Sequence, residues 1–131
     1  MKHEELTSDI IKVFYKVYNC LGYGFLEKIY ENAMCIELQE HGLHVQTQRK
    51  IEVCYKNQLV GTYCADIIVN DLVVLELKAN EFLKEENGTQ LLNYLRATDK
   101  EVGLLLNFGK IPQLKRQVFD NAKKIGVKKH D

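Results

Sequence analysis

Apolar side chains along the first 40 residues recur every three or four positions, which is the spacing of an amphipathic helix. We predict a first helix that starts at about Thr7 or Ser8, either of which can cap it, and ends at residue 21. Gly22 and Gly24 then end this helix, and a second helix is predicted over residues 26–40. The apolar stripe of the first helix consists of Ile10, Phe14, Val17 and Leu21.

Beyond residue 50 the apolar residues occupy alternate positions or form short continuous runs, and both patterns are typical of strands. Ile51, Val53 and Tyr55 predict a first strand, which is followed by a turn at Asn57-Gln58. Pro112, the only proline, suits the first turn of a last helix. The elements predicted after the first strand are strands over residues 59–69 and 72–78, a helix over 85–97, a buried strand over 102–107 and a final helix over 112–124.

The order of these elements (ααβββαβα) predicts an α/β protein. The strand–helix–strand unit from residue 72 to residue 107 should form a right-handed parallel crossover, whereas the preceding hairpins are antiparallel. We therefore expect a four-stranded mixed sheet flanked by helices. The chain has 131 residues and neither an internal repeat nor a linker, so a single domain over residues 1–131 is expected.

Two charged residues interrupt the apolar strand over residues 72–78. Glu76 and Lys78 are two positions apart, so they project from one face of the strand, about 7 Å apart along it. Buried charges are costly unless they are paired, hydrated or bound to a metal. Asp66 in the preceding strand can supply a second carboxylate. Because carboxylates hold hard cations and a lysine can orient water or stabilise phosphorane charge, the pattern suits metal-dependent phosphodiester cleavage. The alternative is a surface salt bridge between Glu76 and Lys78.

The two carboxylates can share a face only in one kind of hairpin. A two-residue loop at Asn70-Asp71 would pair Asp66 with Leu75 and direct Asp66 away from Glu76. An odd-length connection, such as a three-residue loop with a bulge, would place both carboxylates on one face. We predict such a connection between these two strands.

Composition narrows the classes of function. The 18 basic and 18 acidic residues cancel, so net charge does not indicate a nonspecific nucleic-acid binder. Basic residues gather over residues 110–129, which can touch phosphate or, as the more frequent alternative, form a solvated helix face. The four cysteines have no CxxC spacing and are expected to be reduced and buried in the core. Without a signal peptide or a membrane-length apolar run, a cytoplasmic protein is predicted.

Three short motifs occur in the order known from one superfamily. Asp66 followed by ELK at 76–78 resembles the D…(D/E)xK signature of the PD-(D/E)XK nuclease superfamily, whose restriction-endonuclease-like core has the same αβββαβ order. GFLEKIY at 24–30 matches the GxxExxY motif that names a branch of that superfamily. QLLNY at 90–94 resembles the QxxxY motif of its RecB-like members. The sequence departs from the superfamily label at Ala65, where a proline is expected.

The resemblance implies hydrolysis of phosphodiester bonds that depends on magnesium or manganese. Asp66 and Glu76 would bind the metal, and the carbonyl of Leu77 can add a further ligand. Glu27 would provide a third carboxylate, directly or through water. Lys78 would position or activate the attacking water. Because these catalytic positions are all present, the resemblance argues against an inert copy.

The remaining motif residues have supporting roles in this interpretation. Gln90 and Tyr94 are four positions apart, so they share a helix face and can contact the substrate or hold Lys78 in place. In the alternative interpretation both residues are only structural: Gln90 is a glutamine near a helix cap, and Tyr94 is a half-buried tyrosine. We expect Tyr30 to be a packing or orienting residue and Glu31 to face solvent.

Three functions are compatible with this pattern. The first is a metal-dependent nuclease that acts on DNA in preference to RNA, and so small an enzyme would need a homodimer or a delivery partner to span a duplex. The second is a catalytically silent module on the same fold that binds nucleic acid or a partner. The third is a structural role, with a salt bridge between Glu76 and Lys78. The first explains why Glu27 and Asp66 occur in register with the other motif residues.

Overall fold

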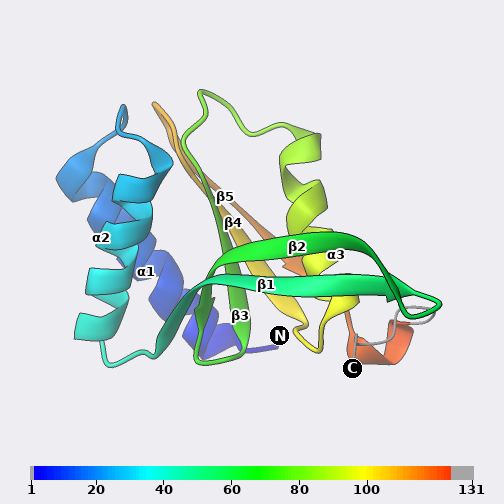
Figure 1. The fold of residues 1–131 in the computed structure, drawn as a ribbon. Helices are drawn as coiled ribbons and strands as arrows, with labels where there is room; N and C mark the ends of the chain where they lie inside the picture. Colours follow the sequence, from blue (N-terminus) through cyan, green and yellow to red (C-terminus); the bar gives the residue numbers. More distant parts are fainter. Residues whose placement is uncertain (1, 125–131) are drawn as a thin grey trace.

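A β-sheet with helices on both faces forms the body of the protein, as seen in a computed structural model that describes residues 2–124 (Figure 1). The helices and strands, in chain order, are α1 (Glu4–Leu21), α2 (Glu27–Glu40), β1 (Val45–Tyr55), β2 (Gln58–Val69), β3 (Val73–Lys78), the 3-10 helix η1 (Glu85–Gly88), α3 (Thr89–Ala97), β4 (Val102–Phe108), β5 (Pro112–Val118) and the 3-10 helix η2 (Asn121–Lys123). Helices α1 and α2 pack on one face of the sheet, and α3 packs on the other.

The five strands lie in the order β1-β2-β3-β4-β5, and all neighbours are antiparallel except β3 and β4. Helix α3 lies between the two parallel strands in the sequence, so the predicted mixed sheet and parallel β-α-β unit are confirmed. The predicted number of four strands is wrong, because Pro112–Val118 forms a fifth strand where a helix was expected.

The fifth strand follows from the burial of its neighbour. Every residue of β4 is buried, so the backbone groups on its outer side need partners, and β5 provides them. Pro112 occupies the first position of this edge strand, where a missing N–H is tolerated. The described part of the basic stretch therefore lies on β5, on the short 3-10 helix η2 and in the adjoining loops instead of on one long helix, and its residues 125–129 are outside the described residues.

Alternation along β3 divides its side chains between two hydrophobic cores. Val73, Leu75 and Leu77 pack with α1 and α2 in the larger core. Val74 packs with α3 in the smaller core on the opposite face. Because successive side chains of a strand alternate, Glu76 lies on the same side as Val74, two residues further along. The larger core also contains Ile10, Phe14, Tyr30, Met34, Leu38, Ile67, Leu104, Leu106 and Phe108.

The turn between β2 and β3 has the odd length predicted from the sequence. Val69 pairs with Val73, which leaves residues 70–72 as a three-residue connection. The first two of these have φ angles of 51° and 57°, and the N–H of the third donates to the Val69 carbonyl at 3.0 Å. Continued one pair beyond the last regular pair, this register sets Asp66 opposite Glu76. The predicted register is therefore confirmed.

Several element boundaries differ from the sequence prediction: β1 begins at Val45 and not near Ile51, and residues 85–88 of the predicted helix form η1. Two further differences concern the start of α1 and the position of the β1–β2 turn. Helix α1 starts at Glu4, so Thr7 is a buried residue within the helix and not its cap, because the extra turn lets Leu6 pack against the core. The β1–β2 hairpin turns at Lys56-Asn57, whose φ angles are both positive, one residue before the predicted position. Neither difference changes the order of the elements.

The cysteines are free thiols, as predicted, but their predicted burial is wrong. Cys20 and Cys54 are exposed, and Cys35 and Cys64 are partly buried. The two exposed cysteines lie in the last turn of α1 and near the tip of the β1–β2 hairpin, at the margins of the packed layers.

Tyr30 of the GxxExxY motif connects the core to the loop between α1 and α2. Its ring stacks on Phe108 with centroids 4.1 Å apart and an interplanar angle of 14°. Its hydroxyl donates to the Gly22 carbonyl at 2.6 Å and accepts from the Phe25 N–H at 3.2 Å. The tyrosine therefore fixes the loop that leads into α2, as expected for an orienting residue.

We predict that Tyr30→Phe lowers the free energy of unfolding by about 1–2 kcal/mol, because two hydrogen bonds of the loop are lost while the ring packing is retained. Urea denaturation followed by circular dichroism measures the change. Tyr55→Phe, at an exposed tyrosine, is the control and should leave stability unchanged. Equal stability of Tyr30→Phe and wild type would show that the hydroxyl does not hold the loop.

Candidate active site

Asp66, Glu76 and Lys78 come together where β2 stops pairing with β3. Glu76 is only 5% exposed, and its Oε2 lies 3.7 Å from the Nζ of Lys78. Asp66 accepts a hydrogen bond through Oδ2 from the N–H of Leu77 at 2.8 Å. This bond ties the carboxylate of Asp66 to the backbone between the other two residues. Two carboxylates and one ammonium group therefore meet where the end of β3 lies beside β2.

Glu27 reaches this end of β3 from the first residue of α2. Its Oε2 accepts from the N–H of Ala79, the residue after Lys78, at a distance of 3.4 Å. The start of α2 and the end of β3 are therefore adjacent. The side chain of Glu27 is exposed, so it can move toward a ligand.

Glu31 also belongs to this cluster, and the prediction that it faces solvent is wrong. It is 6% exposed, and it accepts hydrogen bonds from the Nζ of Lys28 at 3.1 Å and from the Nε2 of Gln48 at 2.8 Å. The spacing from Glu27 is four residues, which puts both carboxylates on one face of α2. That spacing is the signal in the sequence that could have revealed Glu31. Gln48 has no such signal, because only the fold brings it to α2.

Burial and the neighbouring carboxylates raise the pKa values of Asp66 and Glu76. Burial raises the pKa of Asp66, and the charges of Glu31 and Glu27 raise it further, against the opposing effects of the Leu77 N–H and Lys78. Burial, followed by the charge of Asp66, raises the pKa of Glu76 to about 7, and Lys78 offsets only part of this. The pair Asp66 and Glu76 therefore has more negative charge than Lys78 compensates.

A divalent cation is compatible with this donor set. All the acidic donors are carboxylate oxygens, which hard cations such as Mg²⁺ and Mn²⁺ prefer, and Mg²⁺ commonly uses one or two carboxylates together with water. In residues 2–124, no three Asp, Glu, His or Cys side chains converge closely enough to form a complete metal cage. The uncompensated charge of Asp66 and Glu76 is the feature of this site that a cation would relieve.

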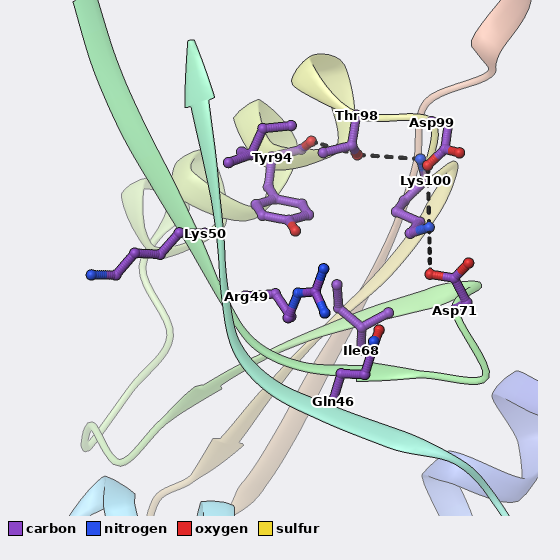
Figure 2. Close-up of a pocket in the computed structure, with 10 residues that line it drawn as sticks. Gln46, Arg49, Lys50, Ile68, Asp71, Tyr94, Thr98, Asp99 and Lys100 are labelled. Atoms are coloured by element: carbon purple, nitrogen blue, oxygen red, sulfur yellow. Dashed lines mark hydrogen bonds and ion pairs between the residues drawn. The ribbon is translucent and has the colours of Figure 1, made fainter. Parts of the chain in front are cut away.

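Gln90 and Tyr94 lie on α3, but they reach different places. The Nε2 of Gln90 donates to the carbonyl of Cys64 at 3.2 Å, two residues before Asp66 on β2. Tyr94 lines a separate cavity between α3 and the β1–β2 hairpin, where it lies near Arg49 (Figure 2). In the described chain neither side chain is hydrogen-bonded to Lys78.

A mixed sheet with helices on both faces and a carboxylate–lysine cluster at the end of its central strand define a restriction-endonuclease-like protein. The sequence agrees, because the model of the PD-(D/E)XK nuclease superfamily matches residues 4–119. The chain belongs to this superfamily. The GxxExxY motif further resembles the branch of that name through Gly24, Glu27 and Tyr30.

A solved structure supports the fold. The crystal structure of SSO0001 superimposes with a TM-score of 0.57 and 18% sequence identity, over 71% of this chain and 50% of that chain. This chain thus spans about half the length of that protein, and at this identity the likeness concerns the fold alone. No curated protein sequence matches the chain.

None of the helices described within residues 2–124 is both long enough and apolar enough to span a membrane.

Glu76 should make the stability of the metal-free protein depend on pH. Its pKa is raised from 4.5 to about 7 by folding, so between these values the folded state holds a proton that the unfolded state releases. The stability that this proton contributes is present at low pH and is lost as pH rises through 7.

We predict that Glu76→Gln, which stays neutral, is more stable than wild type at pH 8 by up to about 3 kcal/mol, and that this difference shrinks toward zero below pH 5. Urea denaturation in EDTA at both pH values measures it. Glu52→Gln, at an exposed strand position, should show no such pH dependence. The same stability difference at both pH values would contradict a raised pKa.

Proposed function

We propose that this protein is a metal-dependent nuclease that hydrolyses phosphodiester bonds, with DNA as its substrate. The observation that carries the proposal is the buried Glu76 beside the partly exposed Lys78, with Asp66 fixed opposite by a hydrogen bond from the N–H of the intervening Leu77. A structural salt bridge would need one acid and one base. Here two carboxylates, those of Asp66 and Glu76, share the single ammonium group of Lys78, an arrangement that costs stability and has a use when a cation is bound.

Each side chain has a role in this proposal. Asp66 and Glu76 would hold Mg²⁺ or Mn²⁺, with Glu27 binding directly or through water. Such a cation polarises the phosphate and lowers the pKa of a water molecule. The ammonium group of Lys78, 3.7 Å from Glu76, would orient that water and stabilise the negative charge that develops on the phosphate. Gln90, bonded to β2 two residues before Asp66, would support the position of that strand.

Glu31 and Gln48 would act as positioning residues. Their mutual hydrogen bond of 2.8 Å joins α2 to β1 beside the carboxylate cluster. The charge of Glu31 raises the pKa of Asp66, so Glu31 adds to the negative potential that attracts a cation.

We predict that millimolar Mg²⁺ or Mn²⁺ raises the melting temperature of wild type by several degrees, because a ligand that binds only the folded state stabilises it by mass action. Asp66→Asn and Glu76→Gln should each abolish the shift, which thermal denaturation with and without EDTA measures. Glu52→Gln should retain it. No shift in wild type would argue against a metal site and favour the catalytically silent binding module.

We predict that wild type cleaves labelled DNA in the presence of Mn²⁺ and that EDTA stops the reaction. Glu76→Gln and Lys78→Ala should each lower the cleavage rate at least about 100-fold, because each removes a group that acts in the transition state. Lys115→Ala, at an exposed lysine of β5, is the matched control and should cleave normally.

The substrate is compared by assaying single-stranded DNA, double-stranded DNA and RNA side by side. Cleavage that survives in both active-site variants would come from a contaminant or another site. Salt-dependent DNA binding without cleavage, unaffected by EDTA, would identify a binding module.

A further inference from the structure

A second polar cavity lies on the α3 side of the sheet, away from the carboxylate cluster. It has a volume of about 250 Å³ and lies between the β1–β2 hairpin and the C-terminal end of α3 (Figure 2). The proposed cleavage of DNA uses none of its residues apart from the sequence-based assignment of Tyr94. The lining residues that matter here are Gln46, Arg49, Ile68, Asp71, Tyr94 and Lys100.

A backbone irregularity in β1 brings Arg49 into this cavity. Gln46 and Arg49 are three positions apart, so in a regular strand they would point to opposite faces of the sheet. Gln48 lies between them with a φ of 50° and is left out of the ladder, in which Thr47 pairs with Ile67 and Arg49 with Ala65. Both Gln46 and Arg49 consequently line the same cavity, while Gln48 turns its amide to α2.

Two hydrogen-bond donors in the cavity have no partner. Tyr94 is only 5% exposed, yet within residues 2–124 its hydroxyl has no hydrogen bond. In the same part of the chain, the guanidinium of Arg49 forms no ion pair or hydrogen bond. Its charge opposes the rise in the pKa of Tyr94 that burial causes. In the close-up, the ring of Tyr94 points toward Arg49 across the cavity (Figure 2). The hydroxyl and the guanidinium are thus free to donate hydrogen bonds to a ligand that enters the cavity.

Lys100 is a further cationic residue in the lining of the cavity. Its Nζ lies 2.8 Å from Asp71 and 3.2 Å from Asp99, so these carboxylates hold it in place. Its backbone N–H donates to the Oγ1 of Thr98, which itself donates to the Tyr94 carbonyl at the end of α3. Arg49 and Lys50 also line the cavity, and within residues 2–124 neither of them forms an ion pair with an acidic side chain.

We propose that this cavity binds a phosphate group of a nucleic-acid strand, through the guanidinium of Arg49 and the hydroxyl of Tyr94. A guanidinium presents paired N–H donors that match two phosphate oxygens, and the tyrosine adds a third donor. A cavity of 250 Å³ accommodates a phosphate together with several waters, each of which occupies about 30 Å³.

The position of the cavity suits a strand that is cut at Glu76. Ile68 in the cavity is two residues from Asp66 along β2, or about 7 Å. Nucleotides rise about 3.4 Å along one strand of a duplex, so the bound phosphate would lie roughly two or three nucleotides from the cleaved bond. The choice of nucleic acid as ligand rests on the proposed nuclease function, whereas phosphate binding at Arg49 and Tyr94 does not.

The test is a binding titration in EDTA, so that cleavage plays no part. Inorganic phosphate and two single-stranded DNA oligonucleotides, one with a 5′-phosphate and one with a 5′-hydroxyl, are titrated into wild type, Arg49→Ala and Tyr94→Phe. We expect wild type to bind phosphate, Arg49→Ala to lose at least about tenfold in affinity and Tyr94→Phe to lose about threefold. Lys12→Ala, at an exposed lysine of α1, should bind phosphate as wild type does.

The oligonucleotides distinguish the source of the phosphate. Tighter binding of the 5′-phosphorylated strand, lost in Arg49→Ala, would assign a terminal phosphate. Equal binding of both strands, weakened alike in Arg49→Ala, would assign a phosphodiester. Wild type that binds none of the three ligands, or variants that bind them as wild type does, would overturn the proposal. If Arg49→Ala does not fold, the proposal is tested with Tyr94→Phe, because this substitution keeps the packing of the ring.

The two proposals can fail separately. Phosphate binding that depends on Arg49 in a protein that cuts no DNA would support the cavity and reject the nuclease. DNA cleavage that depends on Glu76, with phosphate binding indifferent to Arg49 and Tyr94, would support the nuclease and overturn the cavity.

Discussion

The burial of a carboxylate in the central strand is the constraint on which this structure depends. Glu76 lies in β3, between β2 and β4, one residue beyond the last β2–β3 pair, and it is only 5% exposed. The neighbouring carboxylates increase the cost, and one lysine at 3.7 Å compensates part of it. A sequence selected for stability alone would place an aliphatic residue there, so the cluster is understood as stability exchanged for function.

The local geometry of the site follows from two short connections. The three-residue turn after β2 sets the register that puts Asp66 across from Glu76. The loop before α2, fixed by Tyr30, brings the first turn of that helix to the end of β3, where Glu27 meets the N–H of Ala79. The packed sheet and its two cores hold these connections rigidly, so the charged groups meet on a scaffold that is apolar almost everywhere else.

The sequence predicts the parts of this protein that depend on local pattern. The two N-terminal helices, the register at Asp66 and the parallel pair could be derived because periodicity and turn length determine them. The strand that begins at Pro112 could not be derived, because its pattern also suits a helix. Only the need of the buried strand β4 for a hydrogen-bonding partner makes this segment a strand. The burial of Glu31 and the direction of the Arg49 side chain could not be predicted for the same reason, because both depend on contacts between distant segments. The left-handed conformation of Gln48 leaves no mark in the sequence, because glutamine rarely adopts it.

The irregularity at Gln48 has an effect on how molecules of this protein meet one another. Strand β1 is one edge of the sheet, and its exposed backbone groups could pair with the same edge of a second molecule. A residue with positive φ in the middle of that edge breaks the row of hydrogen-bonding groups into two short pieces. Pro112 removes a donor at the start of the opposite edge. Each edge of this open sheet thus has an interrupted row of backbone hydrogen-bonding groups, which disfavours the addition of a strand from a second molecule.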